Sequence, residues 1–563
     1  MATQTNRREF FRQIATADTA ETRAPTTSVR NSSLTSQQET SRFLAQATLG
    51  ANLDLINTVN SMGIEAWIDN QFTVPQSEFL NYVNTQTGYD PTSTDQAPAW
   101  HFRYALGQMM IYGQDLLRQR VALALSEIIV ISSESSSIWS TGNGMAMWFD
   151  MLLRHAFGNY RDLLLDVTLS PMMGNYLSHA GNHKTDLAIN RFPDENYARE
   201  LKQLFTIGLF LLNDDGSLQL DGNGDPIPTY DNSDITEFAK IFTGMDYDHD
   251  GDPRVTWTMR FGGGWLNTYT AVRPLKYYED EHESGPKKLL NGTVVADGQT
   301  ILQDVNAALD NLFEHQNIAP FISRRLIQSL VKSNPSADYI SRISAVFNNN
   351  GANVKGDMQA VIKAILLDDE ARNLSFINTT SNGKLREPFI RFTQLMRAFN
   401  YTNSETKFWD AGWKIENDLR QYPLHAPSVF NFFSPDFVPA GPLAAAGLRG
   451  PEFQMVNSYT AISTINSWHA ALEWDYVINH PDDVTEPAPD FSYEESLVTA
   501  NDIDGLIDHL DLLLTYGTLS SAMRDIMRTA LQGLADVSWH DDMDVVRFAV
   551  HLFMSCPEYA VQV

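Results

Sequence analysis

Apolar residues recur every three to four positions along most of this chain, which is the spacing of one face of an α-helix. The pattern starts near Thr40 and returns after a gap at residue 300. Its longest stretches are QDLLRQRVALALSEIIVIS, MWFDMLLRHAFGNYRDLLLDVTL, TILQDVNAALDNLFEH, IAPFISRRLIQSLV and DMQAVIKAILLDDEAR. Asp357 precedes the last of these and suits the N-cap position of a helix. We therefore predict a mainly α fold.

The pattern also divides the chain. Residues 1–38 are rich in Ser, Thr, Asn and Arg, which predicts a flexible leader. From about 213 to 298, Gly, Asp, Asn, Pro and Tyr become frequent. This composition predicts a loop-rich insertion with short strands, interrupted by one helix at SDITEFAKIFTG. Residues 39–563 then form one large helical domain, and a separate C-terminal helical subdomain from about 383 to 563 also fits the pattern.

Composition narrows the classes of function. The 563 residues carry a net charge of -29, which argues against nonspecific nucleic-acid binding because that needs a basic surface. No run of about 18 apolar residues occurs, so we expect no transmembrane segment. The single cysteine, Cys556, cannot form an internal disulfide and is expected to be a packed small residue.

The N-terminus resembles an export signal in part. Arg7 and Arg8 precede two phenylalanines, as in a twin-arginine signal, but Asp18 and Glu21 interrupt the apolar segment that should follow. A degenerate signal predicts a periplasmic or extracellular protein. A flexible leader without export, and therefore a cytoplasmic protein, is the alternative.

The densest polar motif is DENYARELKQLFTIG, residues 194–208. On a helix, its apolar side chains from Tyr197 to Gly208 share one face, which should be buried. The opposite side carries two pairs spaced by four residues, Glu195 with Arg199 and Asn196 with Glu200. This arrangement suits either a recognition and catalytic surface or a solvated helix face with ordinary ion pairs.

A second candidate is His282, which lies among acidic residues in YYEDEHESGPKKLLNG. Such neighbours raise the pKa of a histidine and suit a general base or a metal ligand. Lys287 follows closely and could hold an anionic group. We expect both to fold back beside Glu200 and Arg199, and His282→Ala to abolish turnover while the melting temperature stays within a few degrees. A surface turn is the alternative.

Two acidic loops resemble parts of calcium sites. Asp246, Asp248 and Asp250 alternate before Gly251 as in the first half of an EF-hand loop, but Trp257 takes the twelfth position. DGNGDP, from residue 221, alternates similarly. Calcium is thus a candidate cofactor, and solvated turns are the alternative.

Isolated cationic and aromatic residues complete the candidates. His179 and His183 are spaced by four, and Arg154 with His155 could line a cleft or belong to the core. The phenylalanines after Ser428 suit either packing or stacking on sugar rings. No Gly-rich phosphate loop or serine elbow occurs, so we expect no nucleotide cofactor.

The chain resembles the bacterial "domain of unknown function 1800" family from about Arg42 to its C-terminus. The resemblance rests on HAFGNYRDLLLDVTLSPMMGNYL, NYARELKQLFTIG, TYDNSDITEFAKIFTG, HESGPKKLLNG, FISRRLIQSLV, LREPFIRFTQLMRAF and APSVFNFFSPDFVPAGPLAAAGLRGPEF. It implies functional positions at His282, Glu283, Gly285 and Lys287 and supports His179 over His183. It also implies relatives in polysaccharide-rich habitats.

Three classes of function fit these features. The first is an exported carbohydrate-active enzyme performing elimination or desulfation on a sulfated or uronate polymer, with Glu200, Glu195, His282 and Lys287 as catalytic groups. Asn196, Arg199, Arg154, His155 and His179 would then bind substrate. The second is a noncatalytic cell-surface or assembly protein with structural calcium. The third is a metal-dependent oxidoreductase using His282.

Overall fold

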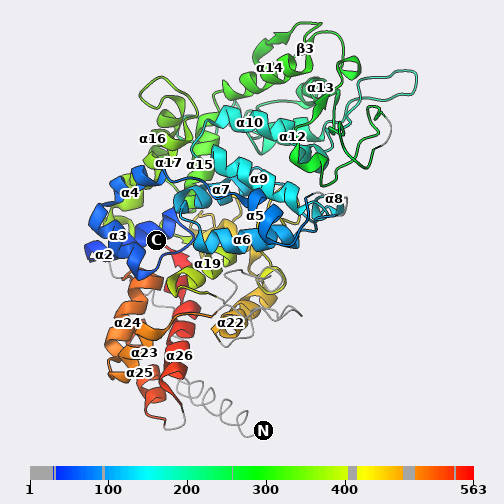
Figure 1. The fold of residues 1–563 in the computed structure, drawn as a ribbon. Coiled ribbons are helices and arrows are strands. Elements are labelled where there is room, and N and C mark those ends of the chain that lie inside the picture. The colour runs from blue at the N-terminus through cyan, green and yellow to red at the C-terminus, as the bar shows by residue number, and fades with distance from the viewer. Residues whose placement is uncertain are drawn as a thin grey trace.

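The computed structural model describes residues 30, 33–91, 96–255, 258–402, 415–472, 488–537 and 540–563, and most of the predicted leader lies outside these ranges. The predicted mainly α fold is confirmed, since helices dominate the described chain and strands occur only as two-residue antiparallel pairs (Figure 1). The first helix begins at Ser36, where the Thr35 side chain accepts a hydrogen bond from the Gln38 amide in a capping box.

The N-terminal helices form the middle of the molecule in Figure 1. They are α2 (Ser36–Ala47), α3 (Leu53–Met62), α4 (Ile64–Gln71), α5 (Phe79–Gln86), α6 (Trp100–Tyr112), α7 (Leu116–Ile128), α8 (Ser136–Trp139), α9 (Gly142–His155), α10 (Tyr160–Leu169) and α11 (Pro171–Tyr176). Helix α7 is buried along nearly all its length and packs against α9 and α4. Its buried residues include Gln119 and Arg120 as well as apolar side chains, so α7 brings polar groups into the core.

The insertion is loop-rich with short strands, as predicted. Helix α12 (Asn196–Gln203) precedes it, and its elements are α13 (Asn232–Ile241), β1 (Met245–Asp246), η1 (Thr270–Val272), β2 (Lys276–Tyr277), η2 (Glu279–Glu281), β3 (Lys287–Lys288), η3 (Leu290–Gly292) and β4 (Val294–Val295). Strand β1 pairs with β2 and β3 with β4, both antiparallel. Isolated bridges such as Phe210 with Pro228 close a hairpin over residues 209–229, which we call the 209–229 hairpin.

Helices resume after the insertion. They are α14 (Ile301–Phe313), α15 (Ile318–Leu330), α16 (Ala337–Asn348), α17 (Met358–Leu367), α18 (Asp369–Arg372), η4 (Leu374–Phe376), α19 (Pro388–Ala398), η5 (Ile415–Leu419), α21 (Pro442–Ala445), η6 (Pro451–Met455) and α22 (Ser458–Leu472). The Asp357 side chain accepts a hydrogen bond from the Ala360 amide, which confirms the predicted cap of α17. Helix α15 packs against α7 and so connects the two groups of helices.

The last helices gather at the lower end of Figure 1. They are α23 (Ser492–Thr499), α24 (Ile503–Leu510), η7 (Asp511–Thr515), α25 (Ser521–Ala535), α26 (Asp542–Ser555) and α27 (Pro557–Ala560). The chain then returns to the middle, where β6 (Val561–Gln562) pairs antiparallel with β5 (Lys384–Leu385). The C-terminus is also held by Arg42 and Gln46, which both donate to the Val563 carbonyl. This return fixes the segment that carries Lys384 and Glu387.

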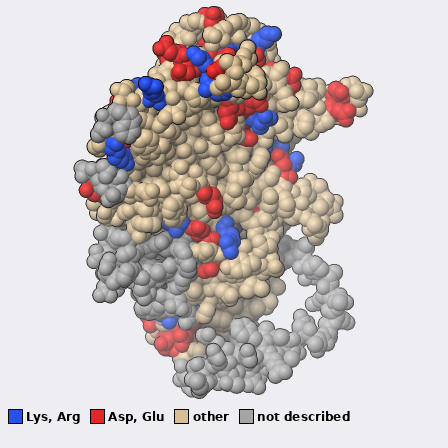
Figure 2. Space-filling view, turned by 90° about the vertical axis from the view of Figure 1, so that its right-hand side faces the viewer, with Lys and Arg blue, Asp and Glu red and all other residues tan. Residues whose placement is uncertain are grey.

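On the face drawn in Figure 2, charged side chains lie in small groups. Figure 2 shows acidic and basic side chains interspersed on one face, with broad uncharged areas between them. Within the described ranges, no helix combines the length and the apolar character needed to cross a bilayer. Cys556 is buried, as expected for a packed residue.

Candidate functional site

The described residues enclose a cleft of about 750 Å³, a volume within the usual range of ligand sites. Five separate segments line it: 124–128 at the end of α7, 203–218, 321–340, 429–436 and 449–452. We call this hollow the arginine cleft, after its three arginines. Sequence reasoning did not find it, because its wall is assembled from residues up to about three hundred positions apart.

Three arginines surround one carboxylate in the cleft. Arg324 and Arg325 project from α15 and contact Asp436 at 2.6 and 3.2 Å, and Arg449 contacts it at 3.0 Å. Burial alone would raise the pKa of Asp436, but the three guanidinium groups outweigh it and hold that pKa at about 2. Asp436 is therefore ionised, and the cluster retains an excess of positive charge.

Apolar side chains form the rim of the cleft. Leu209, Phe210 and Leu218 on the 209–229 hairpin and Phe430 on the facing loop are between 39% and 55% exposed. Exposed apolar groups this close together mark a binding surface more often than an accident of folding. Gly208 lets the hairpin approach, since its φ is +72° and a Cβ atom there would lie 2.8 Å from the Phe321 ring.

Acidic side chains lie beneath this rim. Glu127, near the end of α7, lines the cleft, and the Gln421 side-chain amide contacts both Glu127 and Glu387, at 3.5 and 2.6 Å. Burial, together with the negative charge of Glu387, raises the pKa of Glu127 well above its usual value. Glu452 also lines the cleft, and Lys384 contacts both Glu452 and Glu387, at 3.1 and 3.5 Å.

The predicted site on α12 is divided between surface and core. Glu195 and Arg199 form the expected pair at 3.1 Å and are partly exposed, whereas Asn196 is exposed. Glu200 is buried instead, and burial raises its pKa. Tyr197 is buried as predicted, but the helix ends at Gln203, so residues 204–208 reach the arginine cleft as a turn.

Sequence reasoning missed Lys202 on this helix. Its ammonium lies 3.9 Å from the Phe238 ring centre and 5.7 Å from that of Tyr230, and burial lowers its pKa to about 7. The aromatic faces stabilise the cation in place of a hydrogen-bonding partner.

His282 and Lys287 are core residues. Both contact Asp304 on α14, His282 at 3.0 Å and Lys287 at 2.6 Å, and all three are buried. The other ring nitrogen of His282 donates to the Thr243 carbonyl at 3.0 Å. The described contacts of this triad do not include Glu200 or Arg199. The expectation of one joint site with α12 therefore finds no direct contact to support it.

The three predicted calcium ligands point to different partners. Asp246 is buried and accepts from the Gly262 amide at 2.9 Å, whereas Asp248 pairs with Arg273 and Asp250 with Lys276. Among described residues, no three His, Cys, Asp or Glu side chains are arranged to hold a metal. Trp257 lies outside those residues. The structure therefore does not gather the carboxylates as an EF-hand would. In the second loop, Asp221 caps an exposed turn by accepting from the Asn223 amide.

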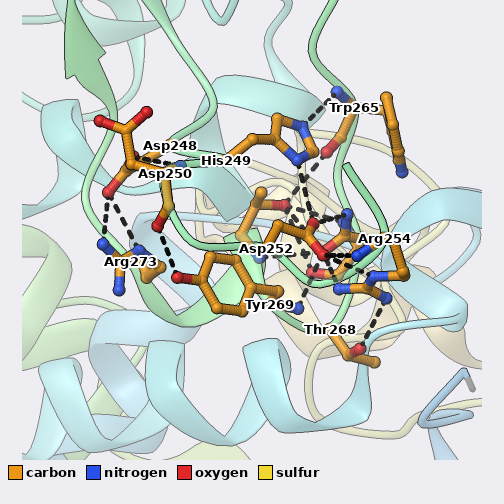
Figure 3. Close-up of polar contacts among 11 residues, drawn as sticks. Asp248, His249, Asp250, Asp252, Arg254, Trp265, Thr268, Tyr269 and Arg273 are labelled. Carbon is orange, nitrogen blue, oxygen red and sulfur yellow. Dashed lines mark hydrogen bonds and ion pairs between the residues drawn. The ribbon is translucent and has the colours of Figure 1, made fainter. Parts of the chain in front are cut away.

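A different polar network orders the loop after β1 (Figure 3). The Trp265 amide donates to His249 Nε2 at 3.2 Å, so the ring proton is on Nδ1 and is donated to Asp252 at 3.1 Å. Arg254 donates to Asp252 at 2.9 Å and to Asn267 at 2.7 Å. Both ring nitrogens of His249 therefore have partners, as expected for a buried polar group.

The remaining candidates on α9, α10 and the following loop are held by local contacts. Arg154 and His155 both contact Asp166 at 2.7 Å, with Arg154 half-exposed and His155 buried. His179 is 1% exposed, and its Nε2 donates to the Thr168 carbonyl at 2.8 Å. The ring packs against Tyr197 in the core, with centroids 4.1 Å apart, and its predicted contact with substrate stays a prediction.

Because of His179, the unfolding free energy should decrease as the pH is lowered. Burial lowers its folded pKa to about 4, below the unfolded value near 6.5. The unfolded chain therefore takes up this proton first, and the stabilisation present above about pH 6.5 is lost as pH falls through 4. We expect His179→Gln to remove up to about 3 kcal/mol of the acid dependence of the unfolding free energy. Denaturant unfolding of the wild type and the variant at pH 7 and pH 4.5 measures this difference. The prediction would be refuted if both proteins lost the same unfolding free energy between the two pH values.

The fold is mainly α, and three arginines line its cleft. The chain belongs to the family described as "Protein of unknown function (DUF1800)", which it matches over residues 42–561. This confirms the family resemblance seen in the sequence. No curated protein matches the chain, and no solved structure does. Segments that carry the resemblance, namely the ends of NYARELKQLFTIG, FISRRLIQSLV and APSVFNFFSPDFVPAGPLAAAGLRGPEF, line the arginine cleft.

Proposed function

We propose that this protein is an exported carbohydrate-active enzyme that binds an anionic polysaccharide in the arginine cleft. The observation that carries the proposal is the grouping of Arg324, Arg325 and Arg449 around Asp436 in a chain with a net charge of -29. An acidic protein repels polyanions except where its own cations are concentrated. The cleft supplies such a concentration.

The chemistry of arginine favours sulfate or carboxylate as the ligand. A guanidinium group presents a planar fork of donors that matches the oxygens of these anions. Asp436 keeps the three side chains in place in the absence of ligand, which reduces the entropy lost on binding. The cluster therefore supports a sulfated or uronate polymer better than a neutral one.

The rim suits the sugar rings themselves. Phe210 and Phe430 are exposed beside the arginines, and aromatic faces stack on the apolar faces of sugars. A cleft of about 750 Å³ has room for a polymer segment in place of a single small anion. Elimination or desulfation suits such a ligand, because arginines stabilise the negative charge that both reactions develop.

Export remains part of this proposal. Arg7 and Arg8 in the leader support a periplasmic or extracellular location, where polymers of this kind are encountered.

A noncatalytic surface or assembly protein is the second candidate. It is favoured by the 185–192 loop, where Leu187, Ile189 and Phe192 are 79%, 65% and 57% exposed. Three such side chains in one short loop suit contact with another protein.

Matched polymers test the proposed function. We expect sulfated and uronate oligosaccharides to bind in titration calorimetry, and their desulfated or carboxyl-reduced counterparts to bind weakly or not at all. Binding should also weaken as salt is added, because the contacts are electrostatic. The products then identify the reaction, since elimination yields an unsaturated sugar and desulfation releases sulfate. Equal binding of acidic and neutral polymers would contradict the proposal.

A further inference from the structure

A cluster of ionisable side chains beside the arginine cleft contains fewer cationic groups than carboxyl groups. It contains two cations, Arg120 and Lys384, and three carboxylates, Glu127, Glu387 and Glu452. Arg120, Lys384, Glu387 and Glu452 are at most 3% exposed. An unbalanced charge in such surroundings is costly, so one of the three carboxyl groups should carry a proton.

The contacts single out Glu127 as the protonated group. Glu452 and Glu387 each contact the Lys384 ammonium. Glu127 contacts no cation among the described ion pairs, and its carboxyl group contacts the Gln421 side-chain amide at 3.5 Å. The same amide contacts Glu387, so the two carboxyl groups are neighbours. One shared proton removes the repulsion between two such negative charges, as in the aspartic protease pair.

Gln421 determines which carboxyl group, that of Glu127 or that of Glu387, is ionised. Its side-chain oxygen accepts from the Phe389 amide at 3.1 Å, so its NH₂ group faces the two carboxyls. That NH₂ donates to Glu387 at 2.6 Å, which stabilises the ionised form of Glu387. Glu127 is the member that lines the cleft and is partly exposed there, whereas Glu387 is fully buried.

We propose that Glu127 holds a proton at neutral pH and donates it to a ligand in the arginine cleft, with Glu387 as the positioning residue that keeps it protonated. The inference rests on the proposed function for the identity of that ligand. The proton would go to the bridging oxygen of the bond that breaks, and that oxygen keeps the bonding electron pair and leaves as a hydroxyl group.

Both candidate reactions balance with this step. In desulfation, the S–O bond breaks, water adds to sulfur, and the proton that water releases restores Glu127. In elimination, the ring C–H proton passes to solvent as the carbon–carbon double bond forms, and solvent restores Glu127. Other charged groups lining the cleft are Arg324, Arg325, Arg449, Asp215 and Asp436. The positive charges of the arginines favour the ionised form of Glu127. For Glu127 to stay protonated, burial and the negative charge of Glu387 must have the larger effect.

Infrared difference spectroscopy tests the shared proton without any substrate. We expect the wild type at pH 7 to show a protonated carboxyl band that is absent from Glu127→Gln. In Glu387→Gln, the neighbouring negative charge is gone, so the pKa of Glu127 should fall and the band should disappear at a lower pH. Glu495→Gln, an exposed residue on α23, controls for loss of any glutamate. A wild type without this band, or one whose band survives Glu127→Gln, would overturn the inference.

Turnover tests the donor role. On a polymer that the wild type processes, Glu127→Gln should lower kcat by about 10²- to 10⁴-fold with little change in the dissociation constant. Glu387→Gln should retain part of the activity and shift the alkaline limb of the pH profile downwards. Full activity in Glu127→Gln would overturn the inference alone. Failure of the wild type to bind any acidic polymer would instead overturn the proposed function, and the donor role with it.

Discussion

Replacing Arg324 and Arg325 together by glutamine is expected to weaken binding of an acidic oligosaccharide by about a hundredfold or more. Each charge-assisted hydrogen bond contributes about 1.5–3 kcal/mol, and two arginines supply at least two of them. The double variant also leaves Asp436 with Arg449 as its only described cationic partner, so the local field becomes less favourable to anions. Titration calorimetry with the oligosaccharide that the wild type binds best gives the ratio of dissociation constants.

The control for this experiment is Arg528→Gln. Arg528 is a partly exposed arginine on α25 that pairs with Asp504 and Asp525, and it does not line the cleft. Its loss should leave binding unchanged although the net charge of the protein changes by one. The cleft would be excluded as the anion site if the double variant, with an unchanged melting temperature, bound the oligosaccharide as tightly as the wild type.

Asp304→Asn is expected to destabilise the protein by about 3–5 kcal/mol. The substitution leaves the Lys287 ammonium and the His282 ring buried without their shared carboxylate. Removing one member of a buried ion pair costs far more than removing a surface pair, because the remaining charge cannot return to water. The shift of the denaturant midpoint, converted with the unfolding slope, measures the loss.

Asp310→Asn on the same helix is the matched control. Asp310 pairs with Arg161 at 2.7 Å, but its side chain is 65% exposed, so its loss should cost about 0–1 kcal/mol. Equal effects of the two substitutions would show that the triad is not a structural unit. The same burial reverses one sequence-based expectation, since His282→Ala should lower the melting temperature instead of preserving it.

Local periodicity was sufficient to predict the helices, and the quoted sequence motifs were sufficient to identify the family. The apolar stripe of 114–132 predicted α7, and Asp357 marked the start of α17 because a side chain can cap a helix only from the residue before it. The Gly- and Asp-rich texture of residues 213–298 predicted short strands in loops, since these residues disfavour regular structure. These features depend on neighbours within a few residues, which the sequence displays directly.

The surroundings of the candidate site residues depended on residues that are distant in the sequence. His282 looked like a loop residue among solvated carboxylates, yet Asp304, 22 residues later on α14, draws it and Lys287 into the core. Asp246, Asp248 and Asp250 alternated like calcium ligands, but each faces a different partner once the chain has folded. Alternation along a chain sets the order of side chains, whereas the direction of each depends on the backbone turn and on the partner that it meets.

The sequence by itself determined a mainly α fold, a loop-rich insertion, membership of the family and an acidic surface. Only the tertiary structure decided where an anion could bind. Adjacent arginines in FISRRLIQSLV and the phenylalanines after Ser428 were visible signals, but neither indicated that Arg324 and Arg325 meet Asp436 across the arginine cleft. The reason is physical: helical periodicity specifies which face of a segment is buried, but the choice of which segments pack together depends on long-range contacts that no local pattern records.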